Sequence, residues 1–408
     1  MFKQLLYSIK RPFHFIKTGL RIGVPAAFKY KNPSRKLKVI VITGTDGKTT
    51  TSTLLYHMLK IAGKKVALIS TVAAYINNES ISTGLHVTSP DPESLNKWMT
   101  RMVEENIEYL ILEFTSHGAY QYRNWGIKPY ITGITNISHE HLDYHLNFDN
   151  YIAAKALLFN KAEYGMLNSD DQYYIKLRSI IKNKVQKIDT YSHEWLKHSK
   201  LTEAIKEKFP ELYNQANAKL AAKICTILEI PRKKQIDAIA SFPGVAGRMQ
   251  SIPNKRQIQV IIDFAHTPNG LESALTALKQ QLSVRKKNGR LIAVYGCAGL
   301  RDAAKRPIMG KIGTQIADYT VFTAEDPRTE NIWSIIRQMK EQLTENHSKI
   351  ISIIDREEAI NYAINKLAKK GDVVGIFGKG PEASMCYGKK EIPWSDLEVA
   401  RKALESKT

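Results

Sequence analysis

Residues 44–50 have the types and spacing that bind phosphate groups. An apolar run over residues 38–43 leads into a loop and a helical pattern that contain Gly44, Thr45, Gly47, Lys48, Thr49 and Thr50. Backbone N–H groups of such a loop cradle phosphate oxygens, the lysine amine reaches the terminal phosphates, and the first threonine offers its hydroxyl to Mg²⁺. The usual phosphate-loop pattern requires glycine at position 42, which is Ile42 here. A glycine-rich turn without a ligand is the alternative, but strand, glycines, lysine and threonine together favour a nucleotide site.

A carboxylate, Glu113, follows four apolar residues near the end of a strand predicted over residues 108–114. Ligand sites of parallel sheets lie along the carboxyl edge of the strands. Because Mg²⁺ prefers oxygen ligands, Glu113 and Thr49 predict a metal site beside the phosphate loop. A strand-end carboxylate in solvent is the alternative, and the phosphate loop on a neighbouring strand argues against it.

Five polar side chains gather in a short segment that follows a strand predicted over residues 129–134. They are His139, Glu140, His141, Asp143 and His145. Clustered histidines suggest zinc, but the HExxH spacing is missing, and a polar loop is favoured. Downstream, Lys155 lies among the apolar residues of a predicted helix, YIAAKALLF. Periodicity alone predicts that its amine extends to solvent.

The elements that must position these residues alternate between strands and helices, which is typical of parallel α/β sheets. In the first half, strands are predicted over residues 38–43, 65–70, 108–114 and 129–134, with helices over 49–62 and 93–105. In the second half, strands are predicted over 260–264, 291–295, 319–323, 350–354 and 373–377, with helices near 268–281, 333–343, 356–368 and 395–404. The Gly/Pro-containing segment 241–248 indicates a boundary. The lysine-rich stretch 176–208 is predicted to be a solvated excursion.

Composition limits the class of protein. The chain has 408 residues, 43% hydrophobic and 24% charged, which excludes disordered, collagenous and membrane-channel classes. Its three cysteines are far apart, so the sequence predicts no disulfide framework and a reducing cytoplasm. The net charge is +21, but no nucleic-acid-binding motif accompanies it, and we expect no nucleic-acid partner.

The excess charge is concentrated in residues 1–38, which contain ten Lys or Arg and no acidic residue. Apolar residues recur there at near-helical spacing, from Phe2 to Leu20. The pattern predicts a helix lying on an anionic membrane surface, or a basic helix packed on its own catalytic domain.

Together these motifs resemble those of the Mur ligases, the ATP-dependent amino-acid-adding enzymes of peptidoglycan synthesis. GTDGKTT, NISHEHLDYH and YIAAKALLF are similar to the family's phosphate loop, its histidine segment and the helix that carries a carbamylated lysine. The resemblance implies catalytic roles for Lys48, Glu113, His141 and Lys155. It implies ATP and two Mg²⁺, with Thr49 and Glu113 holding one ion, and His141 and carbamylated Lys155 the other. Further ATP contacts carried over are Asn214, Asn217, Arg248 and Asp263.

Within the family, the sequence is most similar to the MurE type. TSPDP and EFTSHGAYQYR resemble acceptor-binding segments, and carry over Thr88, Ser89, Thr115, Gln121 and Arg123. GCAGLRDAAKRPIMG, AEDPRTE and GKGPE resemble amino-acid-binding segments, and carry over Arg301, Asp326, Arg328, Gly378 and Glu382. Glu325, Asp326 and Pro381 depart from the family pattern, where Asp, Asn and His stand. The resemblance favours meso-diaminopimelate over L-lysine as the added amino acid.

The resemblance also implies an architecture and a reaction. We expect an α/β fold with a basic segment at 1–38, a P-loop-type ATPase domain at 39–247 and a Rossmann-like domain at 248–408. The reaction would join the diamino acid to the D-Glu carboxylate of UDP-MurNAc-L-Ala-D-Glu through an acyl phosphate, with His266 in a supporting role and the base unassigned. The enzyme is expected to be a cytoplasmic monomer, membrane-peripheral if residues 1–38 bind lipid.

Thirty-eight residues are too few for the family's UDP-binding domain, so the mode of acceptor binding stays open. Two other functions therefore remain as alternatives. One is a Mur-like ligase that acts on a lipid-linked or other non-UDP acceptor. The other is a non-catalytic ATP-binding scaffold at the membrane, against which the intact Lys48, Glu113, His141 and Lys155 argue.

Overall fold

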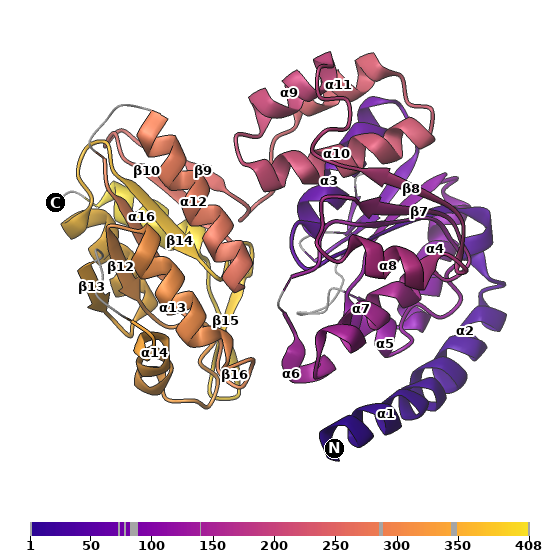
Figure 1. The fold of residues 1–408 in the computed structure, drawn as a ribbon, viewed down its shortest axis with the longest axis horizontal. Coiled ribbons are helices and arrows are strands. Elements are labelled where there is room, and N and C mark those ends of the chain that lie inside the picture. Colours follow the sequence, from indigo (N-terminus) through magenta and orange to yellow (C-terminus); the bar gives the residue numbers. More distant parts are fainter. Residues whose placement is uncertain are drawn as a thin grey trace. The chain divides into compact units, whose positions relative to one another are not determined.

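The computed structural model describes residues 2–406 except 72–73, 77–78, 82–88, 139, 285–288 and 344–348. The chain forms two units, Met1–Pro243 and Gly244–Thr408 (Figure 1). The division falls four residues before the predicted boundary at 247/248, and the basic segment 1–38 belongs to the first unit. Each unit has its own sheet and its own hydrophobic clusters, so each is described by itself.

The first unit is built on an eight-stranded sheet in the order β4-β3-β2-β5-β1-β6-β7-β8. All pairings are parallel except β2–β3 and β3–β4. The strands are β1 (Lys38–Thr43), β2 (Val66–Ile69), β3 (Ala74–Ile76), β4 (Glu79–Ser80), β5 (Tyr109–Glu113), β6 (Pro129–Ile134), β7 (Ala162–Asn168) and β8 (Val185–Tyr191). The central strand β1 places the phosphate loop at its carboxyl end, between β5 and β6.

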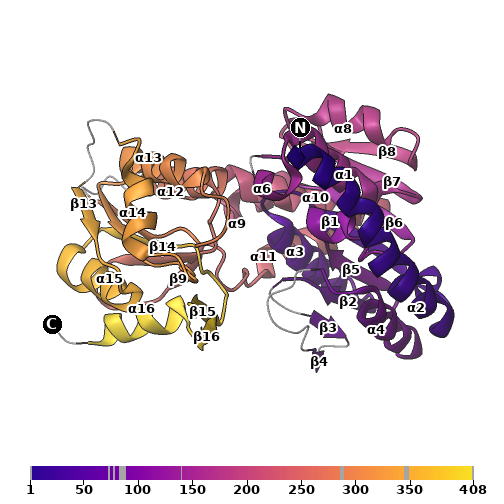
Figure 2. The same cartoon turned by 90° about the horizontal axis from the view of Figure 1, so that it is seen from below.

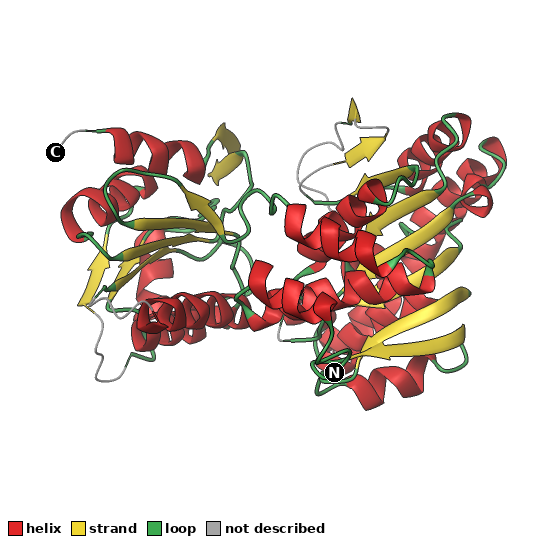
Figure 3. Cartoon of the chain, turned by 90° about the horizontal axis from the view of Figure 1, so that it is seen from above, coloured by secondary structure: helices red, strands yellow, loops and turns green. Residues whose placement is uncertain are grey.

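Helices cover both faces of this sheet (Figure 3). They are α3 (Lys48–Ile61), α4 (Pro92–Glu104), α5 (Ser116–Tyr120), α6 (Leu142–His145), α7 (Phe148–Ala156), η3 (Leu157–Phe159), α8 (Tyr174–Ile181), α9 (Lys200–Lys208), α10 (Leu212–Ile227) and α11 (Arg232–Ser241). On one face, Val39 and Val41 pack with Leu95 and Met99 of α4. The alternate residues of β1 are also buried, because α3 and α10 pack together on the opposite face. Burial on both faces explains why β1 is a continuous apolar run.

The basic segment forms a helical run, α1 (Phe2–His14), η1 (Phe15–Gly23) and α2 (Val24–Lys29), followed by η2 (Pro33–Lys36). This run lies along the first unit (Figure 2), and η1 and α2 contact α4. Of the two predictions for the segment, packing on its own unit is therefore observed. Within the described residues, no helix combines the length and apolar character needed to cross a membrane.

The second unit contains a six-stranded sheet, in the order β13-β12-β11-β14-β10-β9, and a separate antiparallel hairpin, β15–β16. Only β9 is antiparallel within the larger sheet. The strands are β9 (Gln250–Ile252), β10 (Gln259–Asp263), β11 (Leu291–Tyr295), β12 (Tyr319–Phe322), β13 (Lys349–Ser352), β14 (Val373–Phe377), β15 (Ser384–Tyr387) and β16 (Lys390–Pro393).

Two helical layers enclose the larger sheet of the second unit. The helices are α12 (Pro268–Val284), α13 (Lys305–Ile316), α14 (Ile332–Lys340), α15 (Arg356–Tyr362), η4 (Ala363–Leu367) and α16 (Asp396–Glu405). Leu291, Ala293 and Tyr295 of β11 pack with α12–α14, whereas Ile292 and Val294 pack with α15–α16. Successive residues of the strand thus point to opposite layers. The predicted α/β class, with a mainly parallel sheet and a second α/β unit, is confirmed.

One prediction about the chain's organisation is wrong. The stretch 176–208 is not a solvated excursion, because it contains most of α8, strand β8 and helix α9. Strand β8 pairs with β7 at the edge of the first sheet, and only Tyr191 among its residues is buried. An edge strand with a solvated face needs few apolar residues, so a hydrophobicity pattern does not detect it.

Candidate active site

The loop between β1 and α3 has the backbone shape that the phosphate-binding prediction requires. Gly44 and Gly47 have positive φ angles of 143° and 79°. A Cβ atom on Gly47 would lie 2.2 Å from the amide oxygen of Asn217, so α10 approaches the loop too closely for any side chain there. Asn217 in turn donates to the Asn214 amide oxygen at 3.3 Å. The three predicted ATP contacts Gly47, Asn214 and Asn217 are therefore brought together.

Two lysine amines converge on the Gly44 carbonyl oxygen. Lys48 Nζ donates to it at 3.1 Å and to the Thr45 carbonyl at 2.6 Å. Lys155 Nζ donates to the Gly44 carbonyl at 2.6 Å and lies 4.4 Å from the centre of the Tyr151 ring. Lys155 is only 1% exposed, so the periodicity-based prediction of a solvated amine is wrong. Burial, followed by the charge of Lys48, lowers the pKa of Lys155 well below its usual value.

Glu113 joins two segments at the carboxyl edge of the sheet. Its carboxylate accepts hydrogen bonds from the Thr49 hydroxyl at 3.1 Å and from the Thr71 hydroxyl at 2.9 Å. The Thr71 backbone N–H donates to it as well, at 3.1 Å. Because Glu113 is buried, the alternative of a carboxylate in solvent is wrong. Sequence reasoning missed Thr71, although it lies two residues after the end of β2, the strand that pairs with β5.

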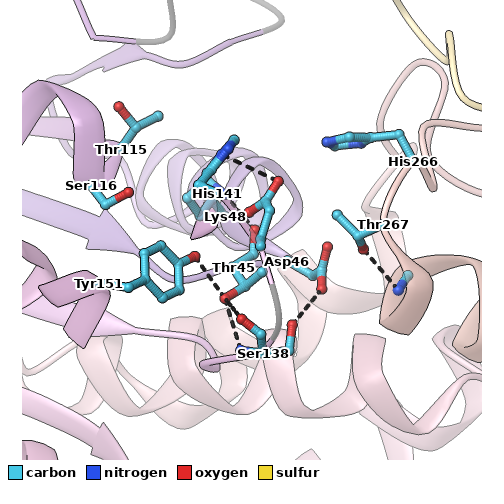
Figure 4. A network of polar contacts seen from close by, with 12 residues as sticks. Thr45, Asp46, Lys48, Thr115, Ser116, Ser138, His141, Tyr151, His266 and Thr267 are labelled. Atoms are coloured by element: carbon cyan, nitrogen blue, oxygen red, sulfur yellow. Dashed lines mark hydrogen bonds and ion pairs between the residues drawn. The ribbon is translucent and has the colours of Figure 1, made fainter. Parts of the chain in front are cut away.

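Thr45 anchors the phosphate loop to the segment that follows β6 (Figure 4). Its hydroxyl lies 2.9 Å from the Tyr151 hydroxyl and accepts from the Ser138 backbone N–H, also at 2.9 Å. The Ser138 hydroxyl donates to the Asp46 carboxylate at 3.4 Å, and the Thr135 hydroxyl donates to the Asp46 carbonyl at 2.6 Å. This network fixes the loop and the histidine segment relative to each other.

The histidine segment forms a packed aromatic cluster. His141 Nε2 is 3.3 Å from a Glu140 carboxylate oxygen, and its ring centre is 4.5 Å from that of His117. His145 is fully buried and hydrogen-bonds the Ser116 hydroxyl at 3.0 Å. Burial, together with the nearby charges of His117, Lys155 and His141, lowers the pKa of His145 to about 2. His145 is therefore a neutral structural group, and His139 lies outside the described residues.

The predicted acceptor contacts form one hydrogen-bonded group around α5. The Ser89 and Thr115 hydroxyls are 2.9 Å apart, and Arg123 donates to the Ser89 carbonyl at 2.9 Å. Arg123 also donates to the Gln121 side-chain oxygen at 3.0 Å. The structure thus brings four of the five predicted residues together, while Thr88 lies outside the described residues.

A residue of the amino-terminal helix reaches this group, which sequence reasoning missed. The Tyr7 hydroxyl is 3.0 Å from His145 Nδ1, and the Tyr7 ring stacks on that of Tyr120 at 4.6 Å. The Tyr120 hydroxyl donates to the Tyr7 carbonyl at 2.5 Å. Helix α1 is therefore joined through Tyr7 to α5, the helix around which the predicted acceptor contacts lie.

In the second unit, the predicted nucleotide contact Arg248 lies just before β9, and Asp263 is the last residue of β10. The Asp263 carboxylate accepts from the backbone N–H groups of Met249 at 2.6 Å and Ala265 at 2.8 Å. The Arg248 guanidinium lies 4.4 Å from the centre of the Phe264 ring. The nearby Thr267 hydroxyl accepts from the Gly270 N–H at 3.0 Å and caps α12 (Figure 4).

The predicted amino-acid contacts are centred on a buried lysine that the sequence reasoning did not select. Lys379 Nζ lies 2.8 Å from the Asp326 carboxylate and 2.6 Å from that of Glu382. Burial lowers the pKa of Lys379, but the two carboxylates outweigh burial, and the pKa is raised overall. A Cβ atom on Gly378 would lie 2.2 Å from a Glu325 carboxylate oxygen, so this glycine allows two loops to meet.

Arg328 lies in the same group, and no hydrogen bond or ion pair joins Arg301 to that group in the residues that the structure describes. Arg328 donates to the Gly299 carbonyl at 2.7 Å, and its backbone N–H donates to the Cys386 carbonyl at 3.0 Å. Both Asp326 and Arg328 have positive φ, 42° and 51°, a strained conformation for residues with side chains. The hairpin β15–β16 holds this loop, whereas Arg301 is exposed.

Comparison with known proteins covers both units. Residues 42–225 match the Mur ligase middle domain, and residues 247–380 match the Mur ligase glutamate ligase domain. The chain is 34% identical over 402 residues to the UDP-N-acetylmuramoyl-L-alanyl-D-glutamate–2,6-diaminopimelate ligase of Clostridium botulinum, covering 94% of this chain and 81% of that one.

The solved structures that resemble the chain include a ligase and a bifunctional synthase. A UDP-N-acetylmuramoyl-L-alanyl-D-glutamate–2,6-diaminopimelate ligase is 28% identical with a TM-score of 0.58, and the match covers 90% of this chain and 78% of that one. A bifunctional folylpolyglutamate synthase/dihydrofolate synthase of Yersinia pestis, complexed with AMPPNP and Mn, has a TM-score of 0.65 over 87% of this chain and 89% of that one. At 19% identity, the second similarity concerns the fold alone.

Proposed function

The chain belongs to the Mur ligase family, a family of ATP-dependent ligases, and on that premise we propose that it adds 2,6-diaminopimelate to UDP-MurNAc-L-Ala-D-Glu. The reaction forms an amide bond at the D-Glu carboxylate while ATP is cleaved to ADP and phosphate. The observation that carries the proposal is the buried Glu113–Thr49 pair beside Lys48 at the phosphate loop. Relatives with 32–36% identity over most of the chain bear the name of this ligase, which supports the choice of substrates.

The donor set at the phosphate loop fits Mg²⁺. Glu113 offers a carboxylate and Thr49 a hydroxyl, both of which are hard oxygen ligands. No group of three or more His, Cys, Asp or Glu suited to a metal occurs in the described part of the chain. A site with one carboxylate and one hydroxyl suits Mg²⁺, because Mg²⁺ uses one or two carboxylates and completes its shell with water and substrate phosphates. The ion would neutralise charge on the transferring phosphoryl group.

Lys155 is proposed to be carbamylated. Its neutral amine would add to CO₂, giving a carbamate and releasing one proton, and the product would be an oxygen ligand. The lowered pKa of the buried amine supports this role, because only an uncharged amine is nucleophilic toward CO₂. With His141, the carbamate would hold a second Mg²⁺.

The protein's own groups would prepare the acceptor carboxylate for attack on ATP. Arg123, supported by Gln121 and the Ser89 carbonyl, would bind an anionic part of the acceptor. Lys48 would exchange its bonds to the Gly44 and Thr45 carbonyls for bonds to the terminal phosphates. The acceptor carboxylate would displace ADP to form an acyl phosphate, and the amine of the amino acid would then displace phosphate.

The second unit supports a diamino acid as the other substrate. A guanidinium such as that of Arg328 binds a carboxylate through two hydrogen bonds. The carboxylates of Asp326 and Glu382, spanned by Lys379, would receive the distal amine. Diaminopimelate has a distal carboxylate and a distal amine on the same carbon, whereas lysine has only the amine. The presence of both kinds of protein group therefore favours diaminopimelate.

The test is product analysis by mass spectrometry. UDP-MurNAc-L-Ala-D-Glu and ATP are incubated with the protein and diaminopimelate, lysine or ornithine, and phosphate release is followed in parallel. We expect the tripeptide product with diaminopimelate and phosphate in equal amount. A non-UDP or lipid-linked acceptor would instead be indicated by phosphate release only with such an acceptor. Absence of phosphate release with every acceptor would refute the ligase function.

A further inference from the structure

The amino-terminal helical run has an inner face fixed to the first unit. Gly19 and Gly23 are buried, and a Cβ atom on either would collide with the Trp125 ring, at 2.9 Å and 2.4 Å respectively. Phe15 also packs on Trp125, with ring centres 5.7 Å apart. With the Tyr7–His145 hydrogen bond, these contacts determine which face of the run is turned away from the unit.

The face turned away carries a row of apolar side chains. Four large side chains are exposed on it, Ile9 (56%), Phe13 (57%), Ile16 (50%) and Leu20 (43%), and we call them the outer stripe. Their spacing of four, three and four residues keeps them on one side of the run, in which Phe15–Gly23 is a π-helix. Single exposed apolar residues are common, but an aligned row of four is typical of an interaction surface.

Cations accompany the outer stripe. Lys10, Lys17 and Arg21 each directly follow a member of the stripe, and all three are exposed. None of them takes part in an ion pair within the described part of the chain, whereas Lys29, further along, pairs with Glu93 at 3.0 Å. Residues 1–38 contain no acidic side chain that could neutralise these charges.

We propose that the outer stripe binds the surface of an anionic lipid membrane. An exposed apolar row flanked by unpaired cations is the arrangement that buries side chains at the acyl boundary while lysine and arginine contact lipid phosphates. A symmetric pair of chains would bring the same cations together on both sides, and the like charges would repel. The charge pattern therefore favours a lipid surface over a second copy of the chain.

The binding mode has a consequence for the acceptor group. The same helical run contacts lipid on its outer face and Tyr120 and His145 on its inner face. Since a helix with its side chains is about 10–12 Å in diameter, the acceptor group would lie about that distance from the lipid surface. This inference concerns location and does not depend on which acceptor or amino acid the enzyme uses.

The test is co-sedimentation of the full chain with two kinds of vesicle, one of equal parts phosphatidylglycerol and phosphatidylcholine and one of phosphatidylcholine alone. We expect binding to the anionic vesicles that weakens with salt, and little binding to the neutral ones. A variant with Ile9→Ser, Phe13→Ser, Ile16→Ser and Leu20→Ser should lose about tenfold or more in partition. A variant with Lys10→Gln, Lys17→Gln and Arg21→Gln should lose a similar factor on anionic vesicles only.

A matched control replaces exposed apolar residues elsewhere, Ile175→Ser with Val284→Ser, and should bind like the wild type. Thermal unfolding and phosphate release should be unchanged in all three variants, because none of these residues lies in the site. Equal binding to both vesicles, or undiminished binding by the stripe variant, would overturn the proposal. A dimer seen without lipid and lost in the stripe variant would assign the stripe to a second copy instead.

Discussion

Lys48 and Lys155 donate hydrogen bonds to the same carbonyl oxygen, that of Gly44. Burial disfavours a charge on Lys155, and the nearby cation of Lys48 adds to that effect. The lowered pKa of Lys155 is the result, while Lys48, at the start of α3, lies where it is proposed to bind phosphate. The phosphate loop itself thus links the two lysines on which the proposed chemistry depends.

Replacing Lys155 with alanine should abolish turnover. The change removes the amine that the proposed carbamate requires, and short carboxylates such as formate or acetate should restore part of the activity by entering the vacated space. Phosphate release with and without added carboxylate measures this. Lys155→Arg is the control, since its bulk prevents rescue. Full activity of the alanine variant would disprove the carbamate role.

Replacing Gly47 with alanine should lower the free energy of unfolding more than the same change at Gly63. Both residues have φ of 79°, so both variants pay about 1–2 kcal/mol of backbone strain. Only Gly47 faces a collision, since a Cβ atom on Gly63 would have nothing within 4 Å. Chemical unfolding should show the larger loss for Gly47→Ala, and binding of an ATP analogue should weaken in that variant alone. Equal losses of unfolding free energy in the two variants would show that the Asn217 side chain moves aside at little cost.

His145 should make the protein less stable in acid. The unfolded chain binds a proton on this histidine near pH 6.5, whereas the folded chain does so only near the lowered pKa of about 2. The contribution to the free energy of unfolding is complete above pH 6.5 and falls by up to about 1.4 kcal/mol per unit below it. Between pH 7.5 and 5, wild type should therefore lose about 2 kcal/mol more than His145→Gln, as measured by urea unfolding. Parallel curves would contradict this assignment.

Replacing Tyr7 with phenylalanine removes one hydroxyl and keeps the stacking ring. The lost hydrogen bond to His145 should lower the free energy of unfolding by about 1 kcal/mol. Tyr174→Phe is a matched control, because its hydroxyl makes no hydrogen bond among the described residues. We also expect a higher KM for the acceptor and an unchanged KM for ATP, since Tyr7 positions α5. A change in the KM for ATP alone would refute this positioning role.

Replacing Arg328 with lysine should raise the KM for diaminopimelate about tenfold or more, because an ammonium group cannot match a carboxylate with two parallel donors. The KM for ATP should not change. Lysine as a substrate lacks the distal carboxylate, so its weak use should be unaffected by the substitution. Steady-state kinetics with both amino acids gives the comparison, and an equal effect on both would place Arg328 elsewhere.

Strands with both faces buried could be predicted closely from the sequence. The bounds of β1, β6, β11 and β14 agree with those expected, because burial on both faces requires continuous apolar runs. Strands β8 and β16 were missed, since one-sided or exposed strands retain polar residues, and β15 was missed because it has only four residues. Helix α13 was missed as well, its amphipathic pattern being weakened by lysine, arginine and glycine.

The residues of the candidate site also divide into those that the sequence predicts and those that it does not. Glu113 and Thr49 could be paired because both lie at the carboxyl edge of neighbouring parallel strands. Thr71, Lys379 and Tyr7 could not be selected, since their roles depend on which loops meet in three dimensions. Tyr7 is the extreme case, because 138 residues separate it from His145 along the chain.

The close packing of Gly19 and Gly23 on Trp125 fixes the rotation of the helix about its axis, and so the direction in which each preceding side chain points. One alanine inserted after Phe13 would rotate the preceding part of the helix by about 100° relative to Trp125. Tyr7 would turn away from His145, and Ile9 and Phe13 would leave the line of Ile16 and Leu20. An insertion that barely changes composition or charge would thus disconnect the helix from the acceptor group and divide its apolar row. The rotation of this helix about its axis therefore matters as much as which residues it contains.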